Sequence, residues 1–173
     1  FIFVRSGQIR VFGERAGTVS SKRRIGYLPE VTLYYPFLKG AEMLKVYGGL
    51  HGLSAATLKT RVPEMLEKVG LGDVGDRLIR NYSKGMQQRL GIAQALIADP
   101  ECLVLDELSS GLDPVGRYDL REVMVELKER GRTIFFSSHE LYEVEALCDR
   151  VVAIDNGHIL FDLGLDELKD RAG

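Results

Sequence analysis

Short apolar runs that alternate with helical stripes constrain the fold of this chain more than any other feature. The runs lie at 102–105, 133–136 and 151–154, and between them apolar residues recur at three- and four-residue spacing. This alternation predicts strand, helix, strand, helix and strand, the order typical of an α/β fold with a parallel sheet. The run at 102–105 is continuous enough to predict a strand covered on both faces, and 133–136 is expected to be a second buried strand.

The first half of the chain is less regular. Residues 7–13 alternate apolar and polar between glycines and predict a short edge strand, and 25–28 predict another. From about 37 to 80 the pattern is helical. Ser54 is placed to cap a helix there, and Pro63 inside the stripe is expected to kink or divide it, because proline removes a backbone donor.

These patterns predict one domain. A chain of 173 residues is long enough for one domain with its own core. We expect an α/β core made of residues 1–30 and 99–173, with a helical subdomain inserted at 31–98. No repeat or low-complexity stretch interrupts this organisation.

Helix and hairpin signals are clear in the second half. Met86 to Ile97 predicts a helix that stops at Asp99-Pro100, and Asp113-Pro114 predicts the N-cap and first turn of the next helix, which Gly131 ends. Asp155-Asn156-Gly157 predicts the turn of a β-hairpin.

Composition excludes several classes of protein. The formal net charge is −2, which gives no overall attraction toward nucleic acid, so we expect no nucleic-acid partner. No apolar run approaches the roughly 18 residues that cross a bilayer. Any role at a membrane is therefore expected to depend on a partner protein.

Two adjacent carboxylates carry the strongest chemical signal. Asp106 and Glu107 follow the run 102–105, and α/β folds bind ligands at the carboxyl ends of their strands. Adjacent side chains on a strand point to opposite sides, so one acid could hold a metal-bound water while the other activates an attacking water, as phosphoryl transfer requires. The alternative is a strand that ends in a solvated acidic turn.

A second candidate site opens the preceding helix. Ser83, Gly85 and the first free backbone N–H groups of that helix could form a small anion site, which the helix dipole would favour. The alternative is an ordinary serine N-cap.

The two sites together resemble a known family. Residues 82–114, YSKGMQQRLGIAQALIADPECLVLDELSSGLDP, are similar to the block of ABC ATPases that runs from the signature motif to the D-loop. The resemblance implies a P-loop NTPase-type sheet with an inserted helical subdomain. It identifies residues 82–86 as the signature motif, of the type seen in an export-like branch. The implied nucleotide-binding residues of the signature are Ser83, Lys84, Gly85 and Met86.

The same resemblance assigns the acidic positions. Residues 103–107 correspond to the Walker B strand, with Asp106 positioning Mg²⁺ and Glu107 acting as general base. Residues 110–113 correspond to the D-loop, with Asp113 contacting the nucleotide site of a partner subunit. Leu108 stands where the family usually has proline, which is expected to loosen the turn.

Two further motifs follow in the family's order. His139 comes after a strand, as the switch histidine does, and would hold the attacking water or the γ-phosphate. Residues 25–30 resemble the stretch that reaches the Q-loop, with Glu30 in place of the usual glutamine. A carboxylate there can still ligate Mg²⁺ through water, so Glu30 is expected to serve both nucleotide and metal.

The resemblance implies ATP and Mg²⁺ as ligands and ATP hydrolysis that powers transport across a membrane. The implied partners are a second ATPase subunit, identical or different, and a transmembrane permease, with the chain peripheral at the cytoplasmic face. Residues 34–37, aromatic and just past the Q-loop position, either contact the permease or belong to the core.

One family motif does not occur in the printed sequence. No G-x-x-x-x-G-K-[ST] loop is present, and that loop supplies backbone donors and a lysine to the phosphates. The first residue is Phe, so we expect a chain that is truncated at its start and nearly inactive alone. Alternatives are a non-catalytic module that lends its signature to an intact partner, and a soluble ABC-type ATPase. Residues 70–75 match G-x-G-x-x-G but follow a helix, which favours a C-cap and loop over a dinucleotide site.

Overall fold

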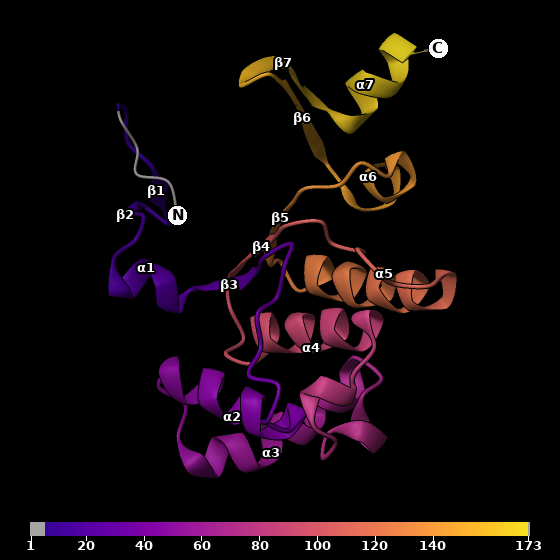
Figure 1. The fold of residues 1–173 in the computed structure, drawn as a ribbon. Helices are drawn as coiled ribbons and strands as arrows, with labels where there is room; N and C mark the ends of the chain where they lie inside the picture. The colour runs from indigo at the N-terminus through magenta and orange to yellow at the C-terminus, as the bar shows by residue number, and fades with distance from the viewer. Residues whose placement is uncertain (1–5, 173) are drawn as a thin grey trace. The chain divides into compact units, whose positions relative to one another are not determined.

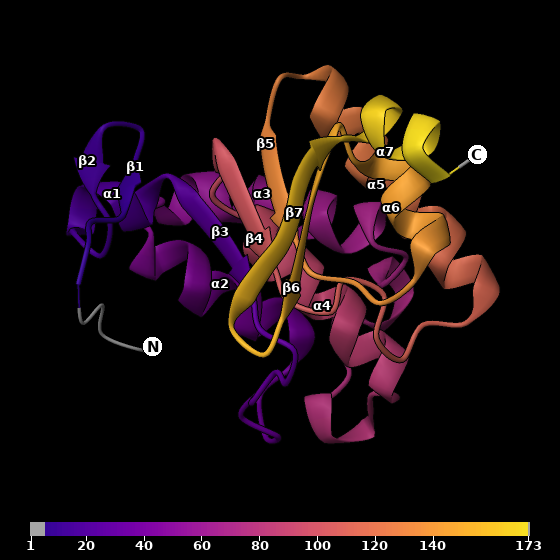
Figure 2. The ribbon, with the colours of Figure 1, turned by 90° about the horizontal axis from the view of Figure 1, so that it is seen from above.

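The computed structural model describes residues 6–172, which fall into two compact units, one ending at Ser137 and the other beginning at Ser138. The first unit is built on a parallel sheet of three strands, β3 (Ile25–Leu28), β4 (Cys102–Leu105) and β5 (Thr133–Phe136), in the order β3-β4-β5. Figure 2 shows the three strands side by side. The bounds of all three agree with the predictions.

Helix α4 (Lys84–Leu96) lies directly on β3, as Figure 1 shows. Two glycines make the close approach possible. A Cβ atom on Gly26 would lie 2.1 Å from the carbonyl oxygen of Ala95, and one on Gly91 would lie 2.5 Å from Cδ1 of Leu28. The sequence predicted this helix, and it ends three residues before Asp99 as expected.

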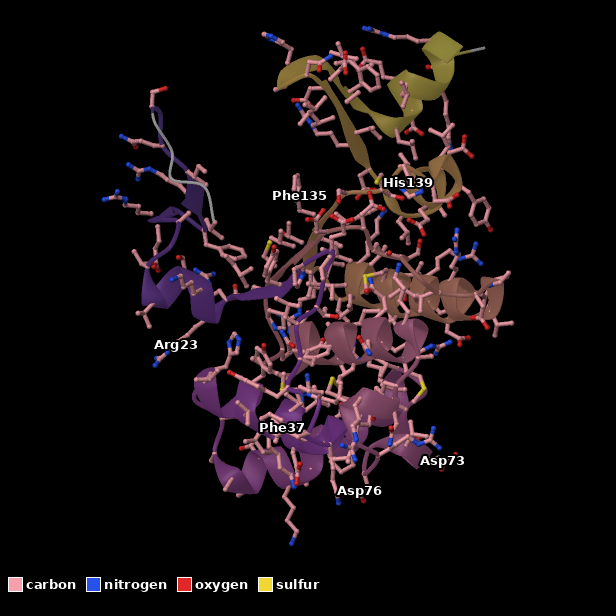
Figure 3. All side chains as sticks on the ribbon, viewed as in Figure 1. Arg23, Phe37, Asp73, Asp76, Phe135 and His139 are labelled. Atoms are coloured by element: carbon pink, nitrogen blue, oxygen red, sulfur yellow. The ribbon has the colours of Figure 1, made fainter. Side chains whose placement is uncertain are left out.

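The opposite face of the sheet is open. Leu103 and Leu105 are 1% and 2% exposed, whereas Tyr27 and Phe135, which flank Val104 in register, are 42% and 66% exposed. Figure 3 shows Phe135 on the face away from α4. The prediction that 133–136 is buried is therefore wrong, since its residues are exposed or half-buried. The prediction that 102–105 is covered on both faces is wrong in part, because Leu103 and Leu105 are buried on one face while Cys102 and Val104 are only half-buried on the other.

The region between β3 and α4 is helical. It contains α2 (Gly40–Leu50), α3 (Ala55–Lys68) and the short 3₁₀ helices η1 (Gly72–Val74) and η2 (Ile79–Asn81). They lie within the predicted insert, whose boundaries stay a prediction.

Helix α3 confirms one prediction and corrects another. Ser54 Oγ accepts the N–H of Thr57, as a capping serine should. Pro63, however, does not divide the helix, and the other expected effect, a kink, stays a prediction. Pro63 lies on the exposed side, while Leu58, Val62 and their neighbours anchor the other side in the core, so the missing hydrogen bond faces solvent. Gly70, with φ of 69°, then ends the helix, which confirms the C-cap interpretation of 70–75.

Helix α5 (Pro114–Glu129) follows its predicted limits closely. Asp113 Oδ1 accepts the N–H of Gly116, and Gly131 takes a φ of 74° just beyond the end. Its apolar stripe is buried as expected, and comprises Leu120, Val123, Met124 and Leu127.

The start of the first unit differs from its prediction. The predicted strand at 7–13 is only β1 (Arg10–Val11), which turns at Phe12-Gly13 and pairs antiparallel with β2 (Glu14–Arg15). Both turn residues have positive φ, which reverses the chain and limits the strand to two residues. The short α1 (Val19–Arg23) then leads to β3.

The second unit contains α6 (Leu141–Leu147), β6 (Arg150–Asp155), β7 (His158–Gly164) and α7 (Leu165–Ala172). The predicted hairpin turn is confirmed, with φ of 48° at Asn156 and 80° at Gly157. The run at 151–154 was predicted to continue the strand–helix succession of a parallel sheet, whereas β6 forms an antiparallel pair with β7. No helix within residues 6–172 is long and apolar enough to cross a membrane.

Candidate active site

The two candidate carboxylates lie in a turn at the carboxyl edge of the sheet. The N–H of Asp106 donates to the carbonyl oxygen of Leu28 at 2.8 Å, and the N–H of Ser137 donates to that of Leu105 at 3.0 Å. The ends of β3, β4 and β5 are thus tied together directly beside the acids. This is the edge at which ligands bind in open α/β sheets.

The backbone reverses at the second acid. Strand β4 ends at Leu105, and Glu107 takes a φ of 53°, a left-handed conformation that few residues other than glycine adopt. The strand alternation argued from sequence therefore does not extend to Glu107. It is this backbone reversal that distinguishes the settings of the two acids, with Asp106 exposed and Glu107 half-buried.

One hydroxyl group contacts both acidic residues. Ser137 Oγ donates to Oδ1 of Asp106 at 2.7 Å and accepts the N–H of Glu107 at 3.0 Å. Ser137 stands at the end of β5, the strand beside β4. No role was expected for Ser137 from the sequence, although a hydroxyl residue directly after the neighbouring strand was a usable signal.

A buried amide holds the same turn from the other side. Gln88 of α4 is 5% exposed, and its Nε2 donates to the carbonyl oxygens of Glu107 at 3.2 Å and Leu108 at 3.0 Å. Leu108 is itself 1% exposed. The side chain of Leu108 is thus anchored in the core and its carbonyl is bonded, while the expectation that leucine loosens the turn relative to proline stays a prediction.

The predicted signature residues open helix α4. Ser83 Oγ accepts the N–H of Met86 at 3.2 Å, so this serine caps the helix. Ser83 and Lys84 are exposed, and Gly85 and Met86 are half-buried. The cap explains Ser83 structurally, and a phosphate-binding role stays a prediction.

The signature packs against the predicted D-loop of the same chain. A Cβ atom on Gly85 would lie 3.1 Å from the carbonyl oxygen of Gly111, and one on Gly111 would meet the methylene groups of Lys84 at 2.8 to 3.0 Å. Asp113, two residues on, is exposed and caps α5. The two motifs therefore form one continuous surface beside the acidic turn.

Glu30 and His139 complete the predicted set. Glu30 is exposed and follows β3 at the same sheet edge as Asp106. His139 belongs to the second unit, where it is exposed and its Nε2 lies 4.0 Å from Oε1 of Glu140. The structure thus brings the acids, the signature and the D-loop together within the first unit, whereas His139 is described with the second.

The donor groups at the turn fit a magnesium ion that is completed by other ligands. Within residues 6–172, no three His, Cys, Asp or Glu side chains gather as a metal site. Mg²⁺ commonly binds through one or two carboxylates together with water and substrate phosphates. The exposed carboxylate of Asp106, beside the Ser137 hydroxyl and at the sheet edge that Glu30 shares, meets that requirement.

Comparison with known proteins decides the family. The family model described as ABC transporter matches residues 3–110, more than half of the chain. The chain belongs to the ABC transporter family. A solved structure of the ATP-binding subunit of an ABC transporter has a TM-score of 0.87 and 32% sequence identity, and it covers 97% of this chain and 71% of its own. The predicted α/β fold of an ABC ATPase is confirmed.

The curated relatives are ATP-binding proteins of ABC transporters. An uncharacterized one from Nostoc sp. strain PCC 7120 is 46% identical over 94% of this chain and 49% of its own length. The bacitracin transport ATP-binding protein of Bacillus licheniformis is 43% identical over 96% and 54%. A fluoroquinolones export ATP-binding protein of Mycobacterium tuberculosis strain CDC 1551 is 42% identical over 79% and 44%. The chain therefore spans about half the length of these relatives.

Proposed function

We propose that this ABC transporter domain belongs to a subunit that binds ATP with Mg²⁺ and hydrolyses it to drive transport across a membrane. The observation that carries the proposal is the turn in which Asp106 and Glu107 are held by Ser137 and by the signature helix. Two of its relatives are named for bacitracin transport and for fluoroquinolone export. The second name favours export as the direction.

The chemistry follows from the two acids. Glu107 would accept a proton from a water molecule, whose oxygen then attacks the γ-phosphorus while the bond to the bridging oxygen of ADP breaks. Asp106, with Glu30 through water, would hold Mg²⁺, which when bound neutralises charge on the phosphates. Ser83, Lys84, Gly85, Met86 and Asp113 would face the nucleotide of a second ATPase subunit, and His139 would orient the attacking water.

The proposed permease contact lies just past β3. Leu33, Tyr35 and Phe37 are 88%, 59% and 67% exposed, and Figure 3 shows where Phe37 lies. Tyr34 is half-buried, whereas these three neighbours are exposed and could contact a partner. Such an apolar surface suits a subunit that docks peripherally, at the cytoplasmic face, on a transmembrane permease.

Mg²⁺-dependent ATP hydrolysis tests the proposal. The chain as printed is expected to be nearly inactive, because it has no G-x-x-x-x-G-K-[ST] loop to hold the phosphates. Joining a P-loop segment to its N-terminus should restore turnover. Glu107→Gln in that fusion should reduce kcat by about 10²-fold or more, since the general base is lost.

The control is Glu129→Gln, which removes an exposed carboxylate at the end of α5. It should leave hydrolysis unchanged. A fusion that does not hydrolyse ATP would contradict the proposed function and favour a module that only lends its signature to a partner. Strong hydrolysis by the unfused chain, lost in Glu107→Gln, would keep the general base but refute the need for the loop.

A further inference from the structure

We propose that Gln88 is a positioning residue for the catalytic turn. Its amide fixes the main chain of Glu107 and so orients the Glu107 carboxylate. The inference deepens the proposed function and rests on it for its catalytic part. Its structural part stands on the geometry alone.

The backbone of Glu107 is strained. Its φ of 53° is a conformation that costs an ordinary L-residue about 1–2 kcal/mol. Such a conformation persists only where the surroundings hold it in place. If the turn relaxed, the carboxylate would move with the backbone, because the side chain leaves directly from the strained residue.

Hydrogen bonds with two side chains hold the Glu107 backbone in this conformation. Gln88 donates to the carbonyl oxygen of Glu107, and Ser137 Oγ accepts the N–H of the same residue. Both polar groups of the Glu107 main chain are thus bonded to side chains of other elements, α4 and the end of β5. Gln88 also donates to the carbonyl oxygen of Leu108. One side-chain amide therefore holds two successive carbonyl groups of the turn.

The side chain of Gln88 is buried. Gln88 is 5% exposed, and a hydrogen bond away from water is harder to replace by solvent than one on the surface. Loss of its amide would leave two carbonyl oxygens with one partner fewer. Both hydrogen bonds that Gln88 Nε2 donates go to the turn that carries Glu107.

Gln88 lies on the helix that the signature motif opens. It lies five residues beyond Ser83, which caps the same helix, and α4 is continuous from Lys84 to Leu96. The signature and the acidic turn are therefore joined through one short rigid path. A displacement of the signature helix by a nucleotide would reach Glu107 through this amide.

Amide hydrogen exchange on the chain as it stands tests the structural part. In Gln88→Met, which has similar volume but no donor, exchange of the Glu107 and Ser110 amides should rise about tenfold, as for the loss of one buried hydrogen bond. The Ser110 N–H donates to the Glu107 carbonyl, so it reports on the same turn. Gln88→Asn, one methylene shorter, should give the same result if the methionine variant does not fold.

The matched control is Gln94→Met, the same substitution in the same helix, at a residue whose side-chain oxygen has no hydrogen-bond partner among residues 6–172. It should leave both amides unchanged. Equal exchange in the Gln88 variants and the wild type would overturn the proposal.

Hydrolysis by the P-loop fusion tests the catalytic part. Gln88→Met should lower kcat about tenfold while KM stays within about twofold, because the base is displaced but nucleotide binding is not. Faster exchange with an unchanged kcat would show that Gln88 is merely structural. A wild-type fusion without hydrolysis would count against the proposed function, and the exchange comparison would still decide whether Gln88 holds the turn.

Discussion

At the scale of single residues, the acidic turn depends on hydroxyl and amide groups more than on the acids themselves. Ser137 is exposed, yet its Oγ bonds the side chain of one acid and the main chain of the other. A hydrogen bond to a carboxylate is stronger than one between neutral groups. Ser137 should therefore contribute to stability despite its exposure.

Ser137→Ala should lower the free energy of unfolding by about 1 kcal/mol, because it removes both bonds at a site where water can partly replace them. Ser137→Thr keeps the hydroxyl and should remain close to the wild type. Urea denaturation of the three proteins measures the difference. Equal midpoints for the alanine and threonine variants would show that the hydroxyl does not support the turn.

The sequence was informative about residues whose signal is local. Asp106 and Glu107 follow an apolar run, and Ser83 and Asp113 each precede a helix, so their positions could be predicted. Gln88 could not, because its partners lie 19 and 20 residues away in the chain. The place of Ser137 directly after β5 was a usable signal, but its partners, 30 and 31 residues away, could not be predicted from the sequence. Which side chain reaches which carbonyl is decided by the packing of α4 and β5 against β4.

At the scale of elements, the contact between α4 and β3 depends on the absence of side chains at two glycines. A Cβ atom on Gly26 would meet the backbone oxygen of Ala95 and side chains of Leu103 and Pro100, all within 2.8 Å. Backbone atoms of a packed helix cannot move aside as a flexible side chain can. Helix and strand would have to separate.

Gly26→Ala should therefore destabilise the protein by about 3 kcal/mol or more, in the range of overpacking in a closed core. Gly49→Ala is the matched control. Gly49 lies in α2 with open space around it, so alanine should raise stability by about 0.5–1 kcal/mol through helix propensity. Thermal unfolding followed by circular dichroism should give shifts of Tm with opposite signs, and a shared sign would contradict the packing argument.

Helices α3 and α5 are joined by an ion pair between Lys68 and Glu126. The hydrogen bond from Lys68 lowers the pKa of Glu126 below its ordinary value. Because the folded pKa is the lower one, this contribution to stability is present above the ordinary glutamate pKa and is lost as the pH falls through the folded value.

Glu126→Gln should accordingly lower Tm at pH 7, and the difference from the wild type should shrink as the pH falls through the lowered pKa of Glu126. The pair is partly exposed, so the difference at pH 7 should be small and should shrink in high salt. A difference that persists unchanged at low pH would assign the effect to packing of the side chain.

The elements themselves were largely predictable, since their limits are set by caps and turns. Ser54, Asp113 and Asn156-Gly157 act where local chemistry places them. Two expectations failed because they concern what surrounds an element. Pro63 stays inside α3 since the buried side of the helix holds it together, and the strand pattern at 102–105 does not reveal which face of the sheet is covered.

At the scale of the whole molecule, one face of the sheet in the first unit carries exposed apolar side chains. Tyr27, Val104 and Phe135 form a row in register across β3, β4 and β5, and Phe135 is 66% exposed. A contiguous apolar row on a sheet favours association with other apolar surfaces.

We expect the chain to associate with itself as its concentration rises, and Phe135→Thr should reduce this association. The substitution should change the free energy of unfolding by less than about 1 kcal/mol, because the ring is mostly exposed. Sedimentation velocity at several concentrations measures the first effect and denaturation the second. Association that is unchanged in Phe135→Thr would show that the chain associates through another surface.

The left-handed backbone at Glu107 has a consequence for anyone who evolves this protein in the laboratory. Glycine accepts that conformation without strain, so stability by itself prefers glycine at the position where the proposed chemistry needs an acid. A library screened for heat resistance alone should drift toward Glu107→Gly, and its most robust members would be inert. Selection for this scaffold must therefore demand turnover and robustness in the same round.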